Sequence, residues 1–536
     1  MLSGCCAYGQ QYFGHRKYYR SNSRHTPQPL FLGGLNVVAL PTRWQSRPAI
    51  SIGLVASGPP RWLAWWLALG GALASIAVVR GHYDPDYFWH LAVGRRILDS
   101  GAIPTVDPFS FTWAGEPWIP DQWLGEVVIA ALAPVAGGAL LLAAFGALAA
   151  IGPVAMAAAA QRSGVRPSTI AVVLALVGST LVPQVTARPQ ALSFGFAGIV
   201  IAVLMLARSH SARALWLLPP LFVVWANTHG YFLAGLASVA VYARFTLIGR
   251  TPLAGHRRAV IAVLLACVVA TMVTPQGPQG LLYAASFLNT SDLGGQMISE
   301  WQPPSFHNPQ FFSFLVVIGV LLSLGFLRPA PGWTRVLAIC GMLAGLIASR
   351  AVGIGTVLAM PALLSTLSWR VSSEPEPNAT ARAWMRVGAA AAVCLVVVSG
   401  ALVRGPVSID QRRVPVSAVE RLAAIDPAAR VFADYGWGGY VMAELSDRGG
   451  TVFVDGRMHK YAPDVMADYL QIVRADPGWD ALVEAHGVEA ILLPPEATLA
   501  TGPAQAAGWC EVMRERDAVL LLRACDAAGA GIDGES

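Results

Sequence analysis

The chain has 536 residues, of which 55% are hydrophobic and 13% are charged, and its mean hydropathy is +0.53. Globular domains carry about 25% charged residues, so this composition excludes an ordinary soluble protein and indicates a membrane protein with many spans. The formal net charge of +6 combines a basic part up to residue 404 with an acidic part after it. The basic residues lie in short loops, which indicates membrane topology and not nucleic-acid binding.

The segment 1–61 is polar, basic and rich in aromatic residues. It contains no apolar region long enough for a signal peptide. We therefore expect a disordered cytoplasmic leader here.

Apolar segments follow, each near the length needed to cross a bilayer. They lie at about 62–79, 136–160, 168–186, 190–207, 214–228, 230–248, 258–275, 310–327, 333–349, 351–368 and 387–403. This pattern predicts an α-helical polytopic domain over residues 62–403 with about eleven transmembrane helices. The pairs around Pro189 and Asn227–Gly230 could be re-entrant, and the short apolar piece 124–133 is expected at the membrane interface.

Arginines occur in the leader and in alternate connections between the apolar segments, which places that side in the cytoplasm. The other side receives the loops 80–135 and 276–309 and the C-terminal region. The chain has only two lysines, Lys17 and Lys460, against many arginines and alanines, which favours a bacterial source. We therefore expect a multi-pass protein of the bacterial cytoplasmic (inner) membrane, with its N-terminus inside and its C-terminal domain outside.

Acidic residues concentrate in the first outside loop. Of the eleven acids before residue 405, seven lie between Asp84 and Glu126. Because acids contribute little to topology, their placement suggests a function on the outer face. Asp84 and Pro85 suit the start of a helix. Asp86 and His90 are four residues apart on one helical face, and a carboxylate oriented by an imidazole is a plausible general base, although helix stabilisation alone would also explain both acids.

Other polar and aromatic residues cluster at the expected outer surface. Arg188 and Arg350 run against the positive-inside trend, and such arginines could bind a lipid phosphate or simply extend to the membrane surface. Rigid aromatic rings beside carboxylates form carbohydrate or headgroup pockets, although tryptophans at this depth also form interfacial belts. The candidate pocket residues are Trp89, Trp118, Asp121, Trp123, Asn227, His229, Glu300 and Trp301.

The region 404–527 has the pattern of a soluble α/β domain, followed by a disordered tail at 528–536. We predict a strand before a glycine-rich turn at Asp434–Gly439, a strong strand at 450–457, amphipathic helices at 463–475 and 479–487, and a further strand at 488–495. Cys510 and Cys525 could form a disulfide if the domain is exported. No dinucleotide fingerprint or Walker motif occurs in the sequence.

The arrangement resembles the GT-C superfamily of integral-membrane glycosyltransferases, which use polyprenyl-phosphate-linked sugars. The motif "DPDYFWHLAVGRRILDSGAIPTVDPFSFTWAGEPWIPDQWLGE" and the later blocks "WANTHGYFLAG", "SEWQPP" and "FVDGRMHKY" also resemble the signature of a bacterial group of multi-span proteins. The resemblance implies that Asp86, or secondly Asp84, acts as the base or positions the acceptor. "DYGWGG" is similar to the Trp-Trp-Asp-Tyr-Gly acceptor motif of oligosaccharyltransferases, although Phe432 and Ala433 replace its tryptophans.

The resemblance implies that a sugar moves from a polyprenyl-phosphate donor to an envelope glycan, lipid or protein acceptor on the outer face of the membrane. Arg350, and secondly Arg188, would hold the phosphate. The acceptor-side candidates are Asp434, Tyr435, Asp455 and Arg457. Asp84, Asp86 and Glu300 could share a divalent cation if they converge. The alternatives are a transporter or lipid flippase, and an envelope-assembly scaffold with a degenerate GT-C fold.

Overall fold

The computed structural model describes residues 61–80, 84–207, 212–286, 298–325, 330–368 and 414–523. All of them belong to one compact unit. The expected leader, the expected eleventh span at 387–403 and the tail at 528–536 lie outside the described residues. So does Cys525, and its pairing with Cys510 therefore stays a prediction.

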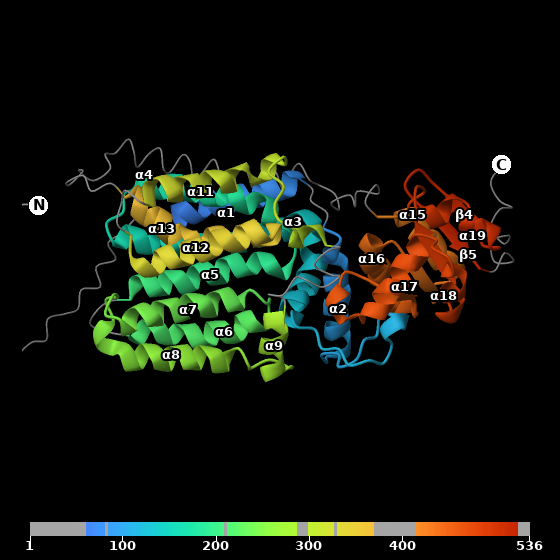
Figure 1. The fold of residues 1–536 in the computed structure, drawn as a ribbon, viewed down its shortest axis with the longest axis horizontal. Coiled ribbons are helices and arrows are strands. Elements are labelled where there is room, and N and C mark those ends of the chain that lie inside the picture. The colour runs from blue at the N-terminus through green and yellow to red at the C-terminus, as the bar shows by residue number, and fades with distance from the viewer. Residues whose placement is uncertain are drawn as a thin grey trace, which may run out of the picture. The chain divides into compact units, whose positions relative to one another are not determined.

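Apolar helices lie side by side in a bundle (Figure 1). They are α1 (Arg61–Arg80), α3 (Trp123–Arg162), α4 (Pro167–Leu181), α5 (Pro189–Leu206), α6 (Leu218–Ala226), α7 (Phe232–Leu247), α8 (Arg257–Ala270), α11 (Phe312–Gly325), α12 (Gly332–Ile347) and α13 (Val352–Leu367). In the described part of the chain, four segments are long and apolar enough to cross a membrane. These are Leu140–Arg162, Pro167–Gln184, Pro189–Leu206 and Ser349–Leu367.

Helix α3 differs from the sequence prediction. The sequence suggested an interfacial piece at 124–133 and a separate span at 136–160, but the structure joins them in one helix of 40 residues. Pro134 and Pro153 lie inside this helix. Apolar bundle helices tolerate internal prolines, because neighbouring groups satisfy the backbone atoms that proline leaves unpaired. One continuous helix thus carries the end of the first loop into the bundle.

Close contact between glycines sets the spacing of α3 and α5. A Cβ atom added at Gly198 would lie 2.3 Å from the carbonyl carbon of Gly152. Gly341 and Gly355 make the same kind of contact between α12 and α13. Small residues allow helix backbones to approach closely within membranes, where packing drives helix association. These contacts hold α5 and α13 in place, and both helices begin at the site described below.

The first loop forms a helix and a turn at one end of the bundle. Helix α2 (Asp86–Ser100) ends at Gly101, whose φ of 65° is in the left-handed region that favours glycine. Beyond it, the loop contacts the C-terminal region through an isolated parallel bridge between Ser110 and Val452. Helices α2 and α9 (Pro278–Ser286) lie at the end of the bundle next to the C-terminal elements (Figure 1).

The C-terminal region contains a mixed five-stranded sheet in the order β2-β1-β3-β5-β4. Its strands are β1 (Arg430–Ala433), β2 (Thr451–Val452), β3 (Ala490–Leu493), β4 (Cys510–Arg514) and β5 (Val519–Leu522). Strand β1 pairs in parallel with β2 and β3, whereas β5 pairs antiparallel with β3 and β4. The helices are α15 (Val416–Ile425), α16 (Tyr435–Leu445), α17 (Pro463–Val473), α18 (Trp479–Ala485) and the short α19 (Pro503–Ala506).

Two sequence predictions for this region need correction. The expected glycine-rich turn at 434–439 is the first turn of α16, because the Asp434 carboxylate accepts a hydrogen bond from the Gly436 backbone N–H at 2.9 Å and caps the helix. The expected strand at 450–457 is paired only at Thr451 and Val452. The residues that follow turn away from the sheet and lead to the site.

We predict that Gly198→Ala destabilises the protein by about 1–3 kcal/mol, because the added methyl group must push α3 and α5 apart. The thermal unfolding midpoint of the full chain in detergent measures this effect. Gly319→Ala in α11 is the matched control, since nothing lies within 4 Å of a Cβ atom added there. Equal midpoints for the two variants would contradict the proposed role of this contact.

Candidate functional site

A cavity of about 370 Å³ is lined both by the loop end of the bundle and by the C-terminal region. Most of the residues predicted from the sequence line it. They are Asp84, Asp86, Trp89, His90, Trp118, Asp121, Arg188, His229, Glu300, Trp301, Arg350, Tyr435 and Arg457. The structure adds lining residues that the sequence did not single out as site residues, among them Gln122, Glu126, Gln190, Tyr283, His459 and Lys460.

Several helices begin at this cavity. They are α2, α3, α5, α13 and α16. Each has a cavity-lining residue within two positions of its first residue, namely Asp86, Gln122, Gln190, Arg350 and Tyr435. The N-terminal end of a helix carries a partial positive charge and unpaired N–H groups, which favour anionic groups. The fold therefore offsets part of the negative charge that the loop acids bring to the cavity.

Arg188 binds three carboxylates at the cavity wall. Its Nη1 atom lies 3.2 Å from Asp84 Oδ2, and its Nη2 atom lies 2.5 Å from Asp86 Oδ2. Glu300 accepts one hydrogen bond from each of these nitrogens at 3.1 Å. The three acids therefore converge, but they converge on a guanidinium. Across the described ranges, no set of three His, Cys, Asp or Glu side chains is placed to hold a metal ion, and we derive no step through a cation.

The environment separates the pKa values of Asp86 and Glu300. Burial raises the pKa of Asp86 to about 6, with Arg188 opposing the shift and Asp84 and Glu300 adding to it. Burial alone would also raise the pKa of Glu300, but Arg188 and Arg350 lower it to about 2. Glu300 therefore stays ionised near neutral pH, whereas Asp86 can exchange a proton there.

The partner of His90 differs from the sequence prediction. His90 Nδ1 lies 3.3 Å from Glu126 Oε1, and both side chains are buried. Asp86 is instead paired with Arg188. The predicted pairing of Asp86 with His90 is therefore wrong, since each residue has a different partner from a distant part of the chain. Glu126 belonged to the unexplained acids of the first loop, which was the only sequence signal for its role.

Arg350 lies next to the ion-pair cluster formed by Arg188, Asp84, Asp86 and Glu300. It keeps a hydrogen-bond donor that is unpaired in the described part of the chain. Its Nη1 atom is 3.8 Å from Glu300 Oε1, and its guanidinium lies 4.7 Å from the centre of the Trp301 ring. Its backbone carbonyl accepts a hydrogen bond from the Tyr231 hydroxyl at 3.0 Å. Its buried Nε atom has no hydrogen-bond partner in the described part of the chain. The side chain is thus held in place but keeps one unpaired donor atom. In Arg188, by contrast, both Nη atoms contact carboxylates.

A second cavity, of about 500 Å³, adjoins the first. It is lined by Pro183, Gln184 and Thr186, which follow α4, by residues of the segment 302–311 and by Ser349. The two cavities share Asp84, Arg188, Gln190, Ser299, Glu300 and Arg350. The ion-pair cluster therefore forms a common wall, and a group bound to Arg350 is accessible from both cavities.

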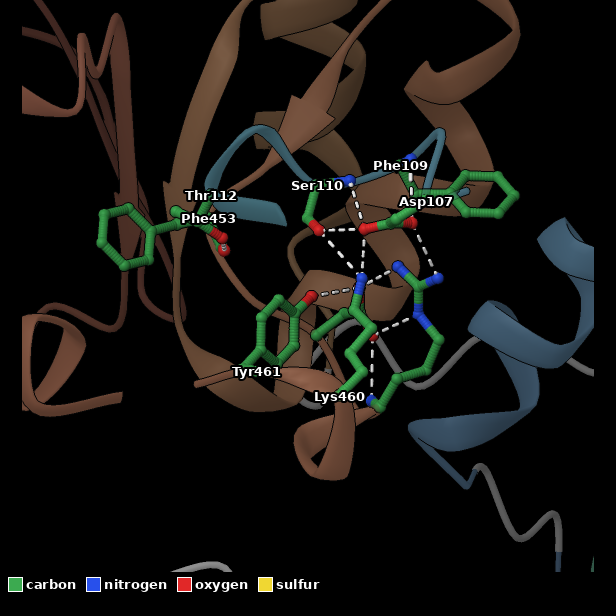
Figure 2. Close-up of polar contacts among 9 residues, drawn as sticks. Asp107, Phe109, Ser110, Thr112, Phe453, Lys460 and Tyr461 are labelled. Carbon is green, nitrogen blue, oxygen red and sulfur yellow. Dashed lines mark hydrogen bonds and ion pairs between the residues drawn. The ribbon is translucent and has the colours of Figure 1, made fainter. Parts of the chain in front are cut away.

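Asp107 ties the first loop to the C-terminal region (Figure 2). Its carboxylate accepts a hydrogen bond from Arg457 Nη1 at 3.0 Å and also contacts Lys460. Asp455 binds Arg457 through both carboxylate oxygens, at 2.8 and 2.5 Å. The Arg457 guanidinium lies 4.4 Å from the centre of the Trp118 ring. These contacts pair the charges of Asp455 and Arg457. These two of the four acceptor-side candidates therefore hold the cavity wall together.

Lys460 extends this group of residues, which we call the Asp107 cluster (Asp107, Ser110, Asp455, Arg457 and Lys460). Its Nζ atom donates to Ser110 Oγ at 2.9 Å. Burial, followed by the neighbouring Arg457, lowers the pKa of Lys460 to about 7, although the two aspartates oppose the shift. Before the structure, only its place among the loop acids pointed to Asp107.

Three predicted residues make structural contacts instead of lining the main cavity. Trp123 Nε1 donates to Asn227 Oδ1 at 2.6 Å, and the Asn227 amide donates to the backbone carbonyls of Val223 and Val273, at 2.8 Å each. Asp434 caps α16. None of these three residues lines the main cavity.

Glycines allow the C-terminal region to approach α2. A Cβ atom at Gly456 would lie 2.6 Å from Asp86 Oδ1, and one at Gly439 would lie 3.3 Å from the Pro85 carbonyl and the Trp89 amide. The glycines of the "DYGWGG" and "VDGR" motifs therefore let the C-terminal backbone reach the candidate base.

Comparisons with solved structures identify the fold. The oligosaccharyltransferase AglB from Archaeoglobus fulgidus, solved with an inhibitory peptide and a dolichol-phosphate, matches at a TM-score of 0.54 and 10% identity over 81% of this chain and 70% of its own. The arabinofuranosyltransferase AftD from Mycobacteria matches at 0.51 and 14% identity over 87% and 40% of the two chains. ArnT from Cupriavidus metallidurans, bound to undecaprenyl phosphate, gives 0.47 and 16% over 88% and 100%.

The TM-scores for the oligosaccharyltransferase AglB and the arabinofuranosyltransferase AftD show that this chain shares their fold. The expected fold resemblance is therefore confirmed. Identities of 10–14% establish the fold alone, so activity has to be argued from the site. No protein-family model and no curated protein sequence matches the chain.

We predict that Asp107→Asn lowers the free energy of unfolding by about 3 kcal/mol, because Arg457 and Lys460 then share one carboxylate in a buried site. Thermal or denaturant unfolding of the full chain measures the loss. Asp99→Asn, at an exposed position of α2, is the control and should change nothing. The double variant Asp107→Asn/Lys460→Met removes the excess cation and should recover part of the stability. No recovery would show that charge balance is not the cause.

Proposed function

We propose that the protein is a membrane glycosyltransferase that moves a sugar from a polyprenyl-phosphate donor to an acceptor on the outer face of the membrane. One observation carries the proposal. In a GT-C fold, a carboxylate whose pKa is near 6 and an arginine with an unpaired donor line the same cavity. They are Asp86 and Arg350, and they supply a base and a phosphate-binding group.

Arg350 is the better candidate for the donor phosphate. Arg188 already binds three carboxylates, so a phosphate would have to displace them. Arg350 has an unpaired Nε atom and lines both cavities. The second cavity is lined partly by helix ends of the apolar bundle, which suits entry of a lipid-linked donor from the membrane. The binding of a dolichol-phosphate by AglB, which has the same fold, supports this assignment.

The reaction needs one proton transfer and one displacement. Asp86 takes the proton from an acceptor hydroxyl, and the hydroxyl oxygen forms a bond to the anomeric carbon of the donor sugar. The bond between that carbon and the phosphate oxygen breaks, and Arg350 stabilises the negative charge on the departing polyprenyl phosphate. A single displacement inverts the anomeric carbon. Glu300, ionised throughout, holds Arg188 and Arg350 in position.

The chain organisation follows from this assignment. We propose a membrane domain at 62–403 with about eleven spans, and an extracytoplasmic α/β domain at 404–527 that supplies the acceptor-side wall. In this wall, Tyr435 and Arg457 line the cavity. The acceptor would then be an envelope glycan, lipid or protein, and the protein would lie in the cytoplasmic membrane of a bacterium.

Asp86→Asn should lower the transfer rate by about 10²–10⁴-fold, since the amide cannot accept the proton. The assay follows formation of decaprenyl phosphate from glycosyl-phosphodecaprenol in membrane vesicles of the native host that contain the protein. Asp99→Asn on the same helix is the control and should retain full activity. Normal transfer by the Asp84→Asn/Asp86→Asn double variant at normal protein level would overturn the proposal and favour a transporter or a scaffold.

The transfer rate should depend on pH through Asp86. The base is active when deprotonated, so the rate should fall as pH drops through about 6 and be about tenfold below its plateau near pH 5. Asp84→Asn removes a negative charge that raises the pKa of Asp86. The midpoint of the pH profile should therefore move to lower pH in this variant. A midpoint that stays unchanged, or that rises, would exclude Asp86 as the titrating group.

A further inference from the structure

Four buried polar atoms without hydrogen-bond partners in the described part of the chain belong to residues that line the main cavity. They are Trp89 Nε1, Glu126 Oε2, Gln190 Oε1 and Arg350 Nε. An unpaired buried polar group costs about 1–3 kcal/mol, and folded proteins keep few of them. Four in one cavity indicate that a ligand supplies the missing partners.

Glu126 is held so that one carboxylate oxygen remains available. Its side chain is 1% exposed and lies in the first turn of α3. The Oε1 atom contacts His90 Nδ1 at 3.3 Å, which fixes the carboxylate, while Oε2 has no partner there. A second carboxyl group, that of Asp121, lines the same cavity. Burial raises the pKa of Asp121 to about 6.

Gln190 presents its acceptor from the neighbouring helix. Its amide nitrogen donates to the Arg350 carbonyl at 3.4 Å, which leaves the Oε1 atom unpaired. The N-termini of α3 and α5 touch, because a Cβ atom at Gly125 would lie 2.7 Å from Pro189 Cβ. Glu126 and Gln190 each follow one of these contact residues. Both residues therefore line the cavity from adjacent helix ends.

The unpaired atoms do not match a phosphate alone. Phosphate oxygens accept hydrogen bonds, so they suit the donors Arg350 Nε and Trp89 Nε1 but not the two acceptors on Glu126 and Gln190. A hydroxyl group both donates and accepts. A sugar ring beside the phosphate could therefore donate to both acceptors.

We propose that Glu126 and Gln190 form the subsite that binds the hydroxyl groups of the transferred sugar, and that Glu126 determines which sugar is accepted. This proposal rests on the proposed glycosyltransferase function, and it names the part of the donor that each residue recognises. Arg350 holds the phosphate, and the two acceptors hold the sugar. His90 is a positioning residue that acts through Glu126.

The test compares lipids that differ only in the sugar. The full chain in lipid nanodiscs is titrated with methyl phosphodecaprenol, which has the charge of the donor but no sugar, and with phosphodecaprenols carrying glucose, mannose, galactose or arabinose. For each sugar, the dissociation constant of methyl phosphodecaprenol divided by that of the sugar-carrying lipid defines the sugar increment. We expect at least one sugar to give an increment above tenfold, and we expect Glu126→Gln to reduce it by about tenfold without weakening methyl phosphodecaprenol.

Gln190→Leu should reduce the increment as well, which keeps the test valid if Glu126→Gln fails to fold. Gln161→Leu is its control, because Gln161 lies near the C-terminal end of α3 and is not among the lining residues of either cavity, and the increment should stay unchanged. An increment that is absent for all four sugars, or that survives both variants, overturns the subsite. The proposed function fails separately if methyl phosphodecaprenol does not bind or if Arg350→Ala binds it equally well, and the subsite then falls with it.

Discussion

The site depends on the ion pairs of Arg188. This guanidinium links the start of α5 to the two aspartates at the start of α2 and to Glu300, which precedes α11 in the chain. Three carboxylates would otherwise repel each other in a partly buried place, where such repulsion is only weakly screened. Arg188 therefore assembles the wall that two cavities share. It also leaves Arg350 beside the cluster as the cation with spare donors.

The two charged clusters of the cavity serve different purposes. In the Asp107 cluster, two aspartates face one arginine and one lysine, so the charges balance and the hydrogen bonds are well paired. Such a cluster fixes the geometry of the wall. Around Arg188, the three acids Asp84, Asp86 and Glu300 contact the two Nη atoms of one arginine. Burial raises the pKa of Asp86, and the two neighbouring acids add to the shift. The Asp107 cluster holds the C-terminal wall over that carboxylate.

The fold supplies the remaining electrostatics. Helices α2, α3, α5, α13 and α16 all begin at the cavity, so their positive ends favour both the resident carboxylates and an incoming phosphate. Close contacts at Gly125 and Gly198 bring α3 and α5 together, and Gly355 brings α13 against α12. Membrane helix packing and site chemistry are thus linked, since the contacts that set helix spacing also set the distances between acceptors in the cavity.

The sequence alone determined the membrane class, most of the bundle helices and the two helices after "VDGR", because hydropathy and periodicity are local properties. It also selected most of the cavity residues, since acids, tryptophans and arginines at an outer surface need an explanation. Only the tertiary structure decided how they pair. Arg188 meets Asp84 and Glu300 across 104 and 112 residues, and Arg457 meets Asp107 across 350. Local spacing favoured His90 for Asp86, but helix packing supplied partners from distant parts of the chain, and no local pattern contains that information.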